Sequence, residues 1–77
     1  LGQVEEAIDY HKKALVIDKE IGYRQGEASD LGNLGIAYSA LGQVEEAIDY
    51  LKQALIIFEE IKSPYAEQIR KMILKLE

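Results

Sequence analysis

Hydrophobic residues recur three and four positions apart along most of the chain, which is the spacing of an amphipathic α-helix. The clearest pattern covers residues 44–61, where two neighbouring apolar stripes predict a helix that is buried on two sides. The stripes are Val44, Ala47, Ile48, Leu51, Leu55 and Phe58, and beside them Tyr50, Ala54, Ile57 and Ile61. Residues 4–21 have the same layout, and Gly22 suits the left-handed turn that often follows a helix.

Two more helices are predicted between and after these segments. A shorter amphipathic pattern over residues 26–41 ends at Gly42, and a last helix begins at Ser63 and Pro64, a favourable capping residue followed by a residue preset for the first turn. No segment alternates as a strand does. We therefore predict an all-α fold of about four helices, arranged as antiparallel hairpins in an α-solenoid fragment with a C-terminal capping helix.

The chain also repeats itself. The ten residues LGQVEEAIDY start at Leu1 and again at Leu41, 40 residues later, and KKALVIDKEI from Lys12 corresponds to KQALIIFEEI from Lys52. Self-similarity at this interval is typical of stacked helical hairpins, in which neighbouring units bury apolar faces that one unit alone would expose.

A spaced motif in the middle of the chain resembles the tetratricopeptide repeat signature. It consists of Leu31-x-x-Leu34-Gly35-x-x-Tyr38 followed by Ala47-x-x-x-Leu51. The resemblance implies one complete helical hairpin over residues 23–62. Residues 1–22 then correspond to the second helix of an incomplete repeat, and residues 63–77 to a capping helix.

Two departures from the signature affect the expected length of the repeat. Leu31 stands where the family usually has tryptophan, and Glu59 stands where it usually has a closing proline, so the second helix can continue for about another turn. The usual period is about 34 residues. The longer period and the Asn33-Leu34-Gly35 triplet are similar to the long-repeat subgroup of kinesin light chains and Leu-Gly-Asn repeat adaptors.

The small size of two residues in the motif has a physical explanation. Gly35 and Ala47 lack bulk where two antiparallel helices would cross, so they predict a close approach of the two backbones. If the motif faces inward, the other side of the same helix carries the candidate peptide-binding residues, since the resemblance implies that this side lines a concave groove. These candidates are Ser29, Gly32, Asn33, Ile36 and Ala40.

Asn33 is the most informative of these candidates because its amide both donates and accepts hydrogen bonds, as a peptide backbone requires. Ile36 offers apolar contact, and the smaller residues leave room. The alternative is that these side chains only pack against the preceding helix. The groove face has no basic residue suited to clamping a C-terminal carboxylate, and the net acidity favours a neutral or basic ligand.

The two copies differ mainly on one face, where polar or small residues become apolar. The changes are His11 to Leu51, Asp18 to Phe58, Ser29 to Ile69, Gly32 to Met72 and Asn33 to Ile73. We expect the faces that change together to meet, so that Asp18 approaches Ser29. His11 should lie further along, near Asn33 or Ile36. In the second copy, the capping helix should cover the preceding one through Ile69, Met72 and Ile73 on Leu51, Leu55 and Phe58.

The first helix lacks a partner of its own, so we expect Val4, Ile8 and Leu15 to face water unless something covers them. An exposed apolar stripe usually marks an interface. These residues are therefore candidates for self-association, and a homodimer is favoured over a filament.

Composition narrows the function classes. The net charge of −5 and the pI near 4.8 oppose binding to nucleic acid. No apolar run approaches the roughly 20 residues of a membrane span, so no membrane association is predicted. The chain has no cysteine, which suits a cytoplasmic location and excludes a thiolate metal site.

Catalytic chemistry finds no support in the sequence. The single histidine, His11, has no companion at ligand spacing, and the glycines form no phosphate-binding loop. The acidic residues Glu5, Glu6 and Asp9 lack the oxygen-rich loop of a calcium site and fit a solvated face. We predict no enzyme activity, no metal and no cofactor. The expected function is a scaffold that binds a peptide segment of a partner protein, with a self-assembling structural module as the alternative.

Overall fold

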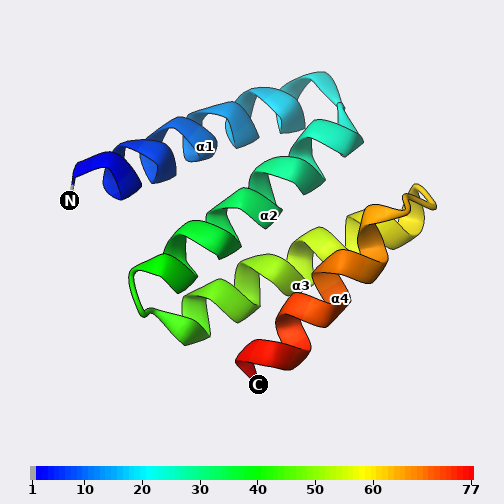
Figure 1. The fold of residues 1–77 in the computed structure, drawn as a ribbon. Helices are drawn as coiled ribbons and strands as arrows, with labels where there is room; N and C mark the ends of the chain where they lie inside the picture. Colours follow the sequence, from blue (N-terminus) through cyan, green and yellow to red (C-terminus); the bar gives the residue numbers. More distant parts are fainter. Residues whose placement is uncertain (1) are drawn as a thin grey trace.

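The computed structural model describes residues 2–77 and has an all-α fold, as predicted. Its helices are α1 (Gly2–Ile21), α2 (Arg24–Ala40), α3 (Val44–Glu60) and α4 (Tyr65–Leu76). Each helix lies antiparallel to the one before it, and the four are stacked in chain order, with α1 and α4 at opposite ends (Figure 1). Leu1, the first residue of the predicted unit 1–22, lies outside the described residues.

The three turns between the helices have the same geometry. Gly22, Gly42 and Lys62 each adopt a left-handed backbone, with φ of 73°, 77° and 56°. The residue that follows each of them donates its N–H to a carbonyl five positions earlier, for example Tyr23 to Asp18 and Ser63 to Phe58. This pattern is the Schellman motif, which pairs carbonyls that the helix end leaves free. The two glycines were predicted, whereas Lys62 was not.

Two helix starts differ slightly from the prediction. α2 begins at Arg24, two residues before Gly26. α4 begins at Tyr65, directly after the predicted Ser63 and Pro64, and the Ser63 hydroxyl accepts a hydrogen bond of 3.1 Å from the Tyr65 N–H. This bond pairs one of the free N–H groups in the first turn of α4.

The main core lies where α2, α3 and α4 meet. Its buried members are Ala28, Leu31, Leu51, Ala54, Ile57, Phe58, Ile69 and Ile73, with Leu55 and Met72 packed at its edge. The predicted cover of α3 by α4 is therefore present. The close approach of α2 to α3 is also present, because a Cβ on Gly35 would lie 2.6 Å from Leu51 Cγ and 3.1 Å from the Ala47 carbonyl oxygen. Only a residue without a side chain fits there.

A smaller core joins α1 to α2. It contains Ile8, Leu34 and Ala37, with Val4 and Leu15 packed against it. The expectation that Val4, Ile8 and Leu15 face water is therefore wrong: Ile8 is buried, and the other two are partly buried. The reason is that α2 has two apolar faces, one for α3 and one for α1. The apolar residues that α1 does expose lie elsewhere on the helix.

Candidate functional site

One side of α2 remains uncovered by its two neighbours and carries the predicted residues Ser29, Gly32, Asn33, Ile36 and Ala40, which we call the α2 groove face. Asn33 is exposed, and Ile36 is 48% exposed although it is a large apolar residue. Gly32 is buried, with Ile69 Cδ1 lying 3.5 Å from where its Cβ would be. Helical spacing of three and four brings these residues to one side.

Three hollows lie along this face, with volumes of about 220, 330 and 290 Å³. Each is several times the roughly 30 Å³ of a water molecule, so each has room for a side chain. Ile36 lines all three hollows, and Asn33 lines two of them. The structure thus brings all five predicted residues to the linings, with Ile36 where the hollows adjoin.

The first hollow lies where α2 meets α3 and α4. Besides Ile36, it is lined by Gly35, Ser39, Leu51, Met72, Lys75 and Leu76. Its wall is mostly apolar. This hollow can take an apolar side chain, with the Lys75 amine near its rim.

The other two hollows lie on either side of Asn33. One lies between α1 and α2 and is lined by Gln3, Val4, Ala7, His11, Asn33, Ile36, Ala37 and Ala40. The other lies between α2 and α4 and is lined by Gln25, Ser29, Gly32, Asn33, Ile36, Phe58, Tyr65, Gln68 and Ile69. Amide side chains therefore flank an apolar centre, an arrangement that can bind both backbone and side chains of a peptide.

Sequence reasoning missed the contributions of α1 and α4 to these hollows. Gln3, Ala7, Tyr65 and Gln68 were not singled out, although their positions opposite Asn33 follow from the stacking of the helices. His11 was expected near Asn33 or Ile36, and it lines one hollow together with both.

A polar cluster lies between α1 and α2, next to that hollow. It consists of His11, Asp18 and Asp30, and the His11 Nδ1 lies 3.6 Å from the Asp30 Oδ1, too far for a hydrogen bond. Asp18 lies against Asp30 and Gly26 rather than Ser29, the expected partner, which is exposed. The residue of α2 that faces Asp18 is therefore Asp30, one position later in the chain than the predicted Ser29.

Burial and, after it, the neighbouring Asp18 carboxyl group together raise the pKa of Asp30 to about 6, because burial disfavours the charged form and the two carboxyl groups can share one proton. When both are ionised they can only accept hydrogen bonds. Accordingly, Asp30 Oδ2 and His11 Nδ1 are buried without a hydrogen-bond partner within residues 2–77. Asp30 was not singled out from the sequence, because an acidic residue in an amphipathic helix is ordinarily solvated.

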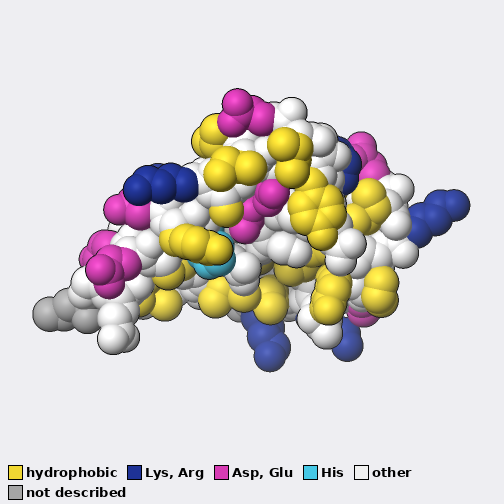
Figure 2. All heavy atoms as spheres, turned by 90° about the horizontal axis from the view of Figure 1, so that it is seen from above, with side chains coloured by type: hydrophobic (Ala, Val, Ile, Leu, Met, Phe, Trp, Pro, Cys, Tyr) yellow, Lys and Arg dark blue, Asp and Glu magenta, His cyan; other side chains and the backbone are white. Residues whose placement is uncertain are grey.

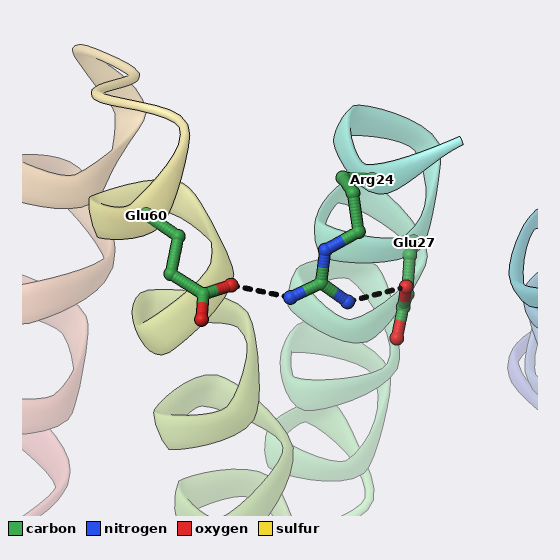
Figure 3. A network of polar contacts seen from close by, with 3 residues as sticks. All are labelled: Arg24, Glu27 and Glu60. Atoms are coloured by element: carbon green, nitrogen blue, oxygen red, sulfur yellow. Dashed lines mark hydrogen bonds and ion pairs between the residues drawn. The ribbon is translucent and has the colours of Figure 1, made fainter. Parts of the chain in front are cut away.

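A second polar network links α2 to α3 near the α4 turn. The Arg24 guanidinium pairs with Glu60 on α3 and, at 2.9 Å, with Glu27 on its own helix (Figure 3). The bond to Glu60 raises the pKa of Arg24 above its usual value. This network links the start of α2 to the end of α3 but does not line the groove.

No three or more histidine, aspartate or glutamate side chains within residues 2–77 are arranged to hold a metal ion. None of the four helices over this range combines the length and apolarity that crossing a bilayer demands.

Comparison with known proteins supports the motif found in the sequence. The family model described as tetratricopeptide repeat matches residues 1–60, which cover α1, α2 and α3. Searches of curated proteins and of solved structures returned no significant match. The family match covers most of the chain and includes the helices that carry the signature residues and most of the groove. The chain therefore belongs to the tetratricopeptide repeat family.

Proposed function

We propose that the protein is a scaffold that binds a peptide segment of a partner protein along the α2 groove face. Tetratricopeptide repeats are generally protein–protein interaction modules and typically non-catalytic. The observation that carries the proposal is the junction of three hollows at Ile36, with the Asn33 amide beside it. An exposed isoleucine between cavities of side-chain size is suited to contact with another chain.

The linings favour a particular ligand chemistry. Apolar walls at Leu51, Met72 and Ile69 suit aliphatic or aromatic side chains, while Asn33 and Gln68 can pair with a peptide backbone. Lys75 is the one lysine or arginine among the residues that line the three hollows. The ligand is therefore an internal apolar segment rather than a terminal carboxylate, which would need several cations.

The proposal can be tested by selecting binding peptides from a random displayed library and measuring their affinity for groove variants. Ile36→Glu should weaken binding more than tenfold, because it places a charge among apolar walls. Asn33→Ala should weaken it about threefold to tenfold, the equivalent of one hydrogen bond.

Ile56→Glu is the matched control, since Ile56 is 58% exposed on α3 and lines none of the three hollows. It should leave affinity within about twofold. If the control weakens binding as much as Ile36→Glu does, the ligand does not occupy the groove and the proposal fails.

Two finer assignments rest on sequence. We infer the long-repeat subgroup, resembling kinesin light chains and Leu-Gly-Asn repeat adaptors, from the 40-residue period and the Asn33-Leu34-Gly35 triplet. A cytoplasmic location remains a prediction from the composition. We do not carry forward a homodimer through Val4, Ile8 and Leu15, because those side chains pack within the chain.

A further inference from the structure

The polar cluster of His11, Asp18 and Asp30 lies inside the contact between α1 and α2. Most acidic side chains of the protein are on its surface, and Figure 2 shows several of them projecting from the face that it draws. Asp30, by contrast, is only 8% exposed, and His11 and Asp18 opposite it are partly buried. These groups therefore meet where an ionised side chain loses much of its hydration.

The internal repeat shows that the fold does not need ionisable groups at this place. The equivalent contact, 40 positions later in the chain, is that between α3 and α4. There Leu51 stands in place of His11, and Phe58 stands in place of Asp18. Both are almost fully buried in the main core. Apolar side chains on α3 thus fill the space that polar ones fill on α1.

The other member of the cluster differs in the same way. Arg70 of α4 stands in place of Asp30, and its guanidinium pairs with Glu59 and Glu67, both exposed. The α3–α4 contact therefore has an apolar interior with ion pairs at its surface. The α1–α2 contact encloses its charged groups instead.

The geometry of the cluster depends on one proton. Asp18 lies against Asp30 and also against Gly26, where a Cβ would be 2.6 Å from Asp18 Oδ2. A side chain at position 26 would therefore collide with that carboxyl group. With one proton between them, Asp18 and Asp30 can hydrogen-bond to each other. Without it, both groups are acceptors only and their charges repel.

The imidazole of His11 does not compensate for the lost proton in this structure. Its Nδ1 lies 3.6 Å from Asp30 Oδ1, and this nitrogen and Asp30 Oδ2 are both buried without a hydrogen-bond partner within residues 2–77. A buried polar atom without a partner destabilises the contact that encloses it. The ionised cluster therefore weakens the packing of α1 on α2.

The other charged side chains near Asp30 are already paired. Glu27, one turn earlier on α2, binds Arg24, and Arg24 also binds Glu60 of α3. The charged groups that act on Asp30, an aspartate and the histidine, both belong to α1. The proton of the cluster is therefore linked to the position of α1 and not to that of α3.

The pKa of Asp30 gives the direction of the effect, since it is raised from 3.8 to about 6 in the folded chain. The stabilisation that the proton gives to the α1–α2 contact is complete below about pH 4 and is lost as the pH rises through about 6. We propose that this contact is a proton-sensitive hinge between successive repeats, closed in acid and loosened at neutral pH. The apolar α3–α4 contact stays closed throughout.

The hinge has a consequence for the groove. In a repeat protein, the small rotation between neighbouring units sets the curvature of the whole stack. A looser α1–α2 contact therefore changes how the α2 groove face is oriented relative to α1. This effect of pH does not depend on which ligand the groove binds.

Amide hydrogen exchange of the complete 77-residue chain tests the hinge. Protection factors, which correct for the intrinsic effect of pH on exchange, are compared at about pH 5 and about pH 7.5. The protection of Ile8 and Leu15 on α1 should fall about threefold to tenfold, the range that the shift of Asp30 allows after screening by solvent. The protection of Ile69 and Ile73 on α4 should stay within about twofold.

Variants of the cluster show whether it is the cause. Asp30→Asn should abolish the pH dependence of α1. Asp18→Asn should move it to lower pH, because Asp18 raises the pKa of Asp30, and His11→Gln should move it to higher pH, because His11 lowers that pKa. A purely structural role would weaken protection at every pH without moving the midpoint. Asp9→Asn, which removes an exposed carboxylate from the same helix, is the matched control and should change neither.

A second measurement covers the case in which the α1 amides exchange too fast to be measured. The chain has no cysteine, so a nitroxide spin label can be attached at a single Lys13→Cys on α1. The line broadening that it causes on amides of α2 should change between about pH 5 and about pH 7.5. Gln53→Cys is the matched control, because it is the exposed counterpart on α3. Its broadening of α4 amides should stay constant.

Three results overturn the proposal. The first is that α1 protection and the broadening from Lys13→Cys are both independent of pH. The second is an equal loss of protection in α1 and α4, which would assign the effect to unfolding of the whole chain. The third is a pH dependence of α1 that Asp30→Asn leaves in place.

Discussion

Two glycines of α2, three residues apart, have different roles. Gly35 lies at the crossing with α3, where a Cβ would be 2.6 Å from Leu51 Cγ, whereas a Cβ on Gly32 would meet Ile69 at an ordinary 3.5 Å. Both positions are helical, so alanine gains intrinsic helix propensity at each. Comparing Gly35→Ala with Gly32→Ala therefore isolates the effect of the steric contact at Gly35.

Gly35→Ala should lower the free energy of unfolding by about 1–3 kcal/mol, because overpacking outweighs the gain in propensity. Gly32→Ala should raise it by up to about 1 kcal/mol. Urea unfolding followed by circular dichroism measures both. Equal effects of the same sign would contradict the close crossing.

Because of Asp30, the stability of the folded protein should depend on pH in a predictable way. The pKa of this side chain is raised from 3.8 to about 6, so the folded chain holds this proton more tightly than the unfolded chain does. The stability that the proton provides is complete below about pH 4 and is lost as the pH rises through about 6. His11 opposes the shift, because a protonated imidazole would favour the ionised carboxylate.

Asp30→Asn should remove this loss while keeping a group that donates to Asp18. At about pH 7.5 the variant should be more stable than the native chain by about 1 kcal/mol, since solvent screening reduces the full linkage value. The advantage should disappear near pH 4. Denaturant unfolding of both proteins across this range is the measurement, and a variant that is less stable at the higher pH would show that the ionised carboxylate is favourable.

At the scale of single residues, the sequence predicted the groove better than the polar cluster. Ser29, Asn33 and Ile36 could be found because helical spacing fixes which side of α2 they share. Asp30 was missed because its burial depends on how α1 rotates against α2. No local pattern specifies that rotation.

The helices themselves were largely predictable, since α1 and α2 are each followed by a residue with a recognisable tendency to end a helix. Gly22 and Gly42 could be identified because glycine adopts the left-handed region without strain. Lys62 adopts the same geometry at a φ of 56°. Its side chain gives no sign of this, so the turn was predicted only from Ser63 and Pro64 beyond it.

Lys62→Gly should therefore stabilise the protein by up to about 1 kcal/mol. Glycine relieves the left-handed strain at this position, and the larger conformational entropy that glycine loses on folding offsets part of that gain. Gly42→Ala should destabilise it by about 1 kcal/mol through the same strain. Thermal unfolding compares the two. Destabilisation by Lys62→Gly would mean that the lysine side chain contributes more than its backbone costs.

On the scale of the whole molecule, the stacking of the helices explains the groove. Stacking in chain order leaves one side of α2 uncovered along its length. The order of stacking was predictable from the 40-residue period. The burial of Val4, Ile8 and Leu15 was not, because which of two apolar stripes on α1 meets α2 depends on the rotation of the helix.

The amide chemical shifts of the protein on addition of a library-selected peptide test most directly whether ligands bind along α2. We expect perturbations concentrated at Ser29, Asn33 and Ile36, with smaller changes at Gln68 and Met72 across the hollows. Perturbations confined to the solvent side of α3 around Ile56, with Asn33 and Ile36 unchanged, would contradict it.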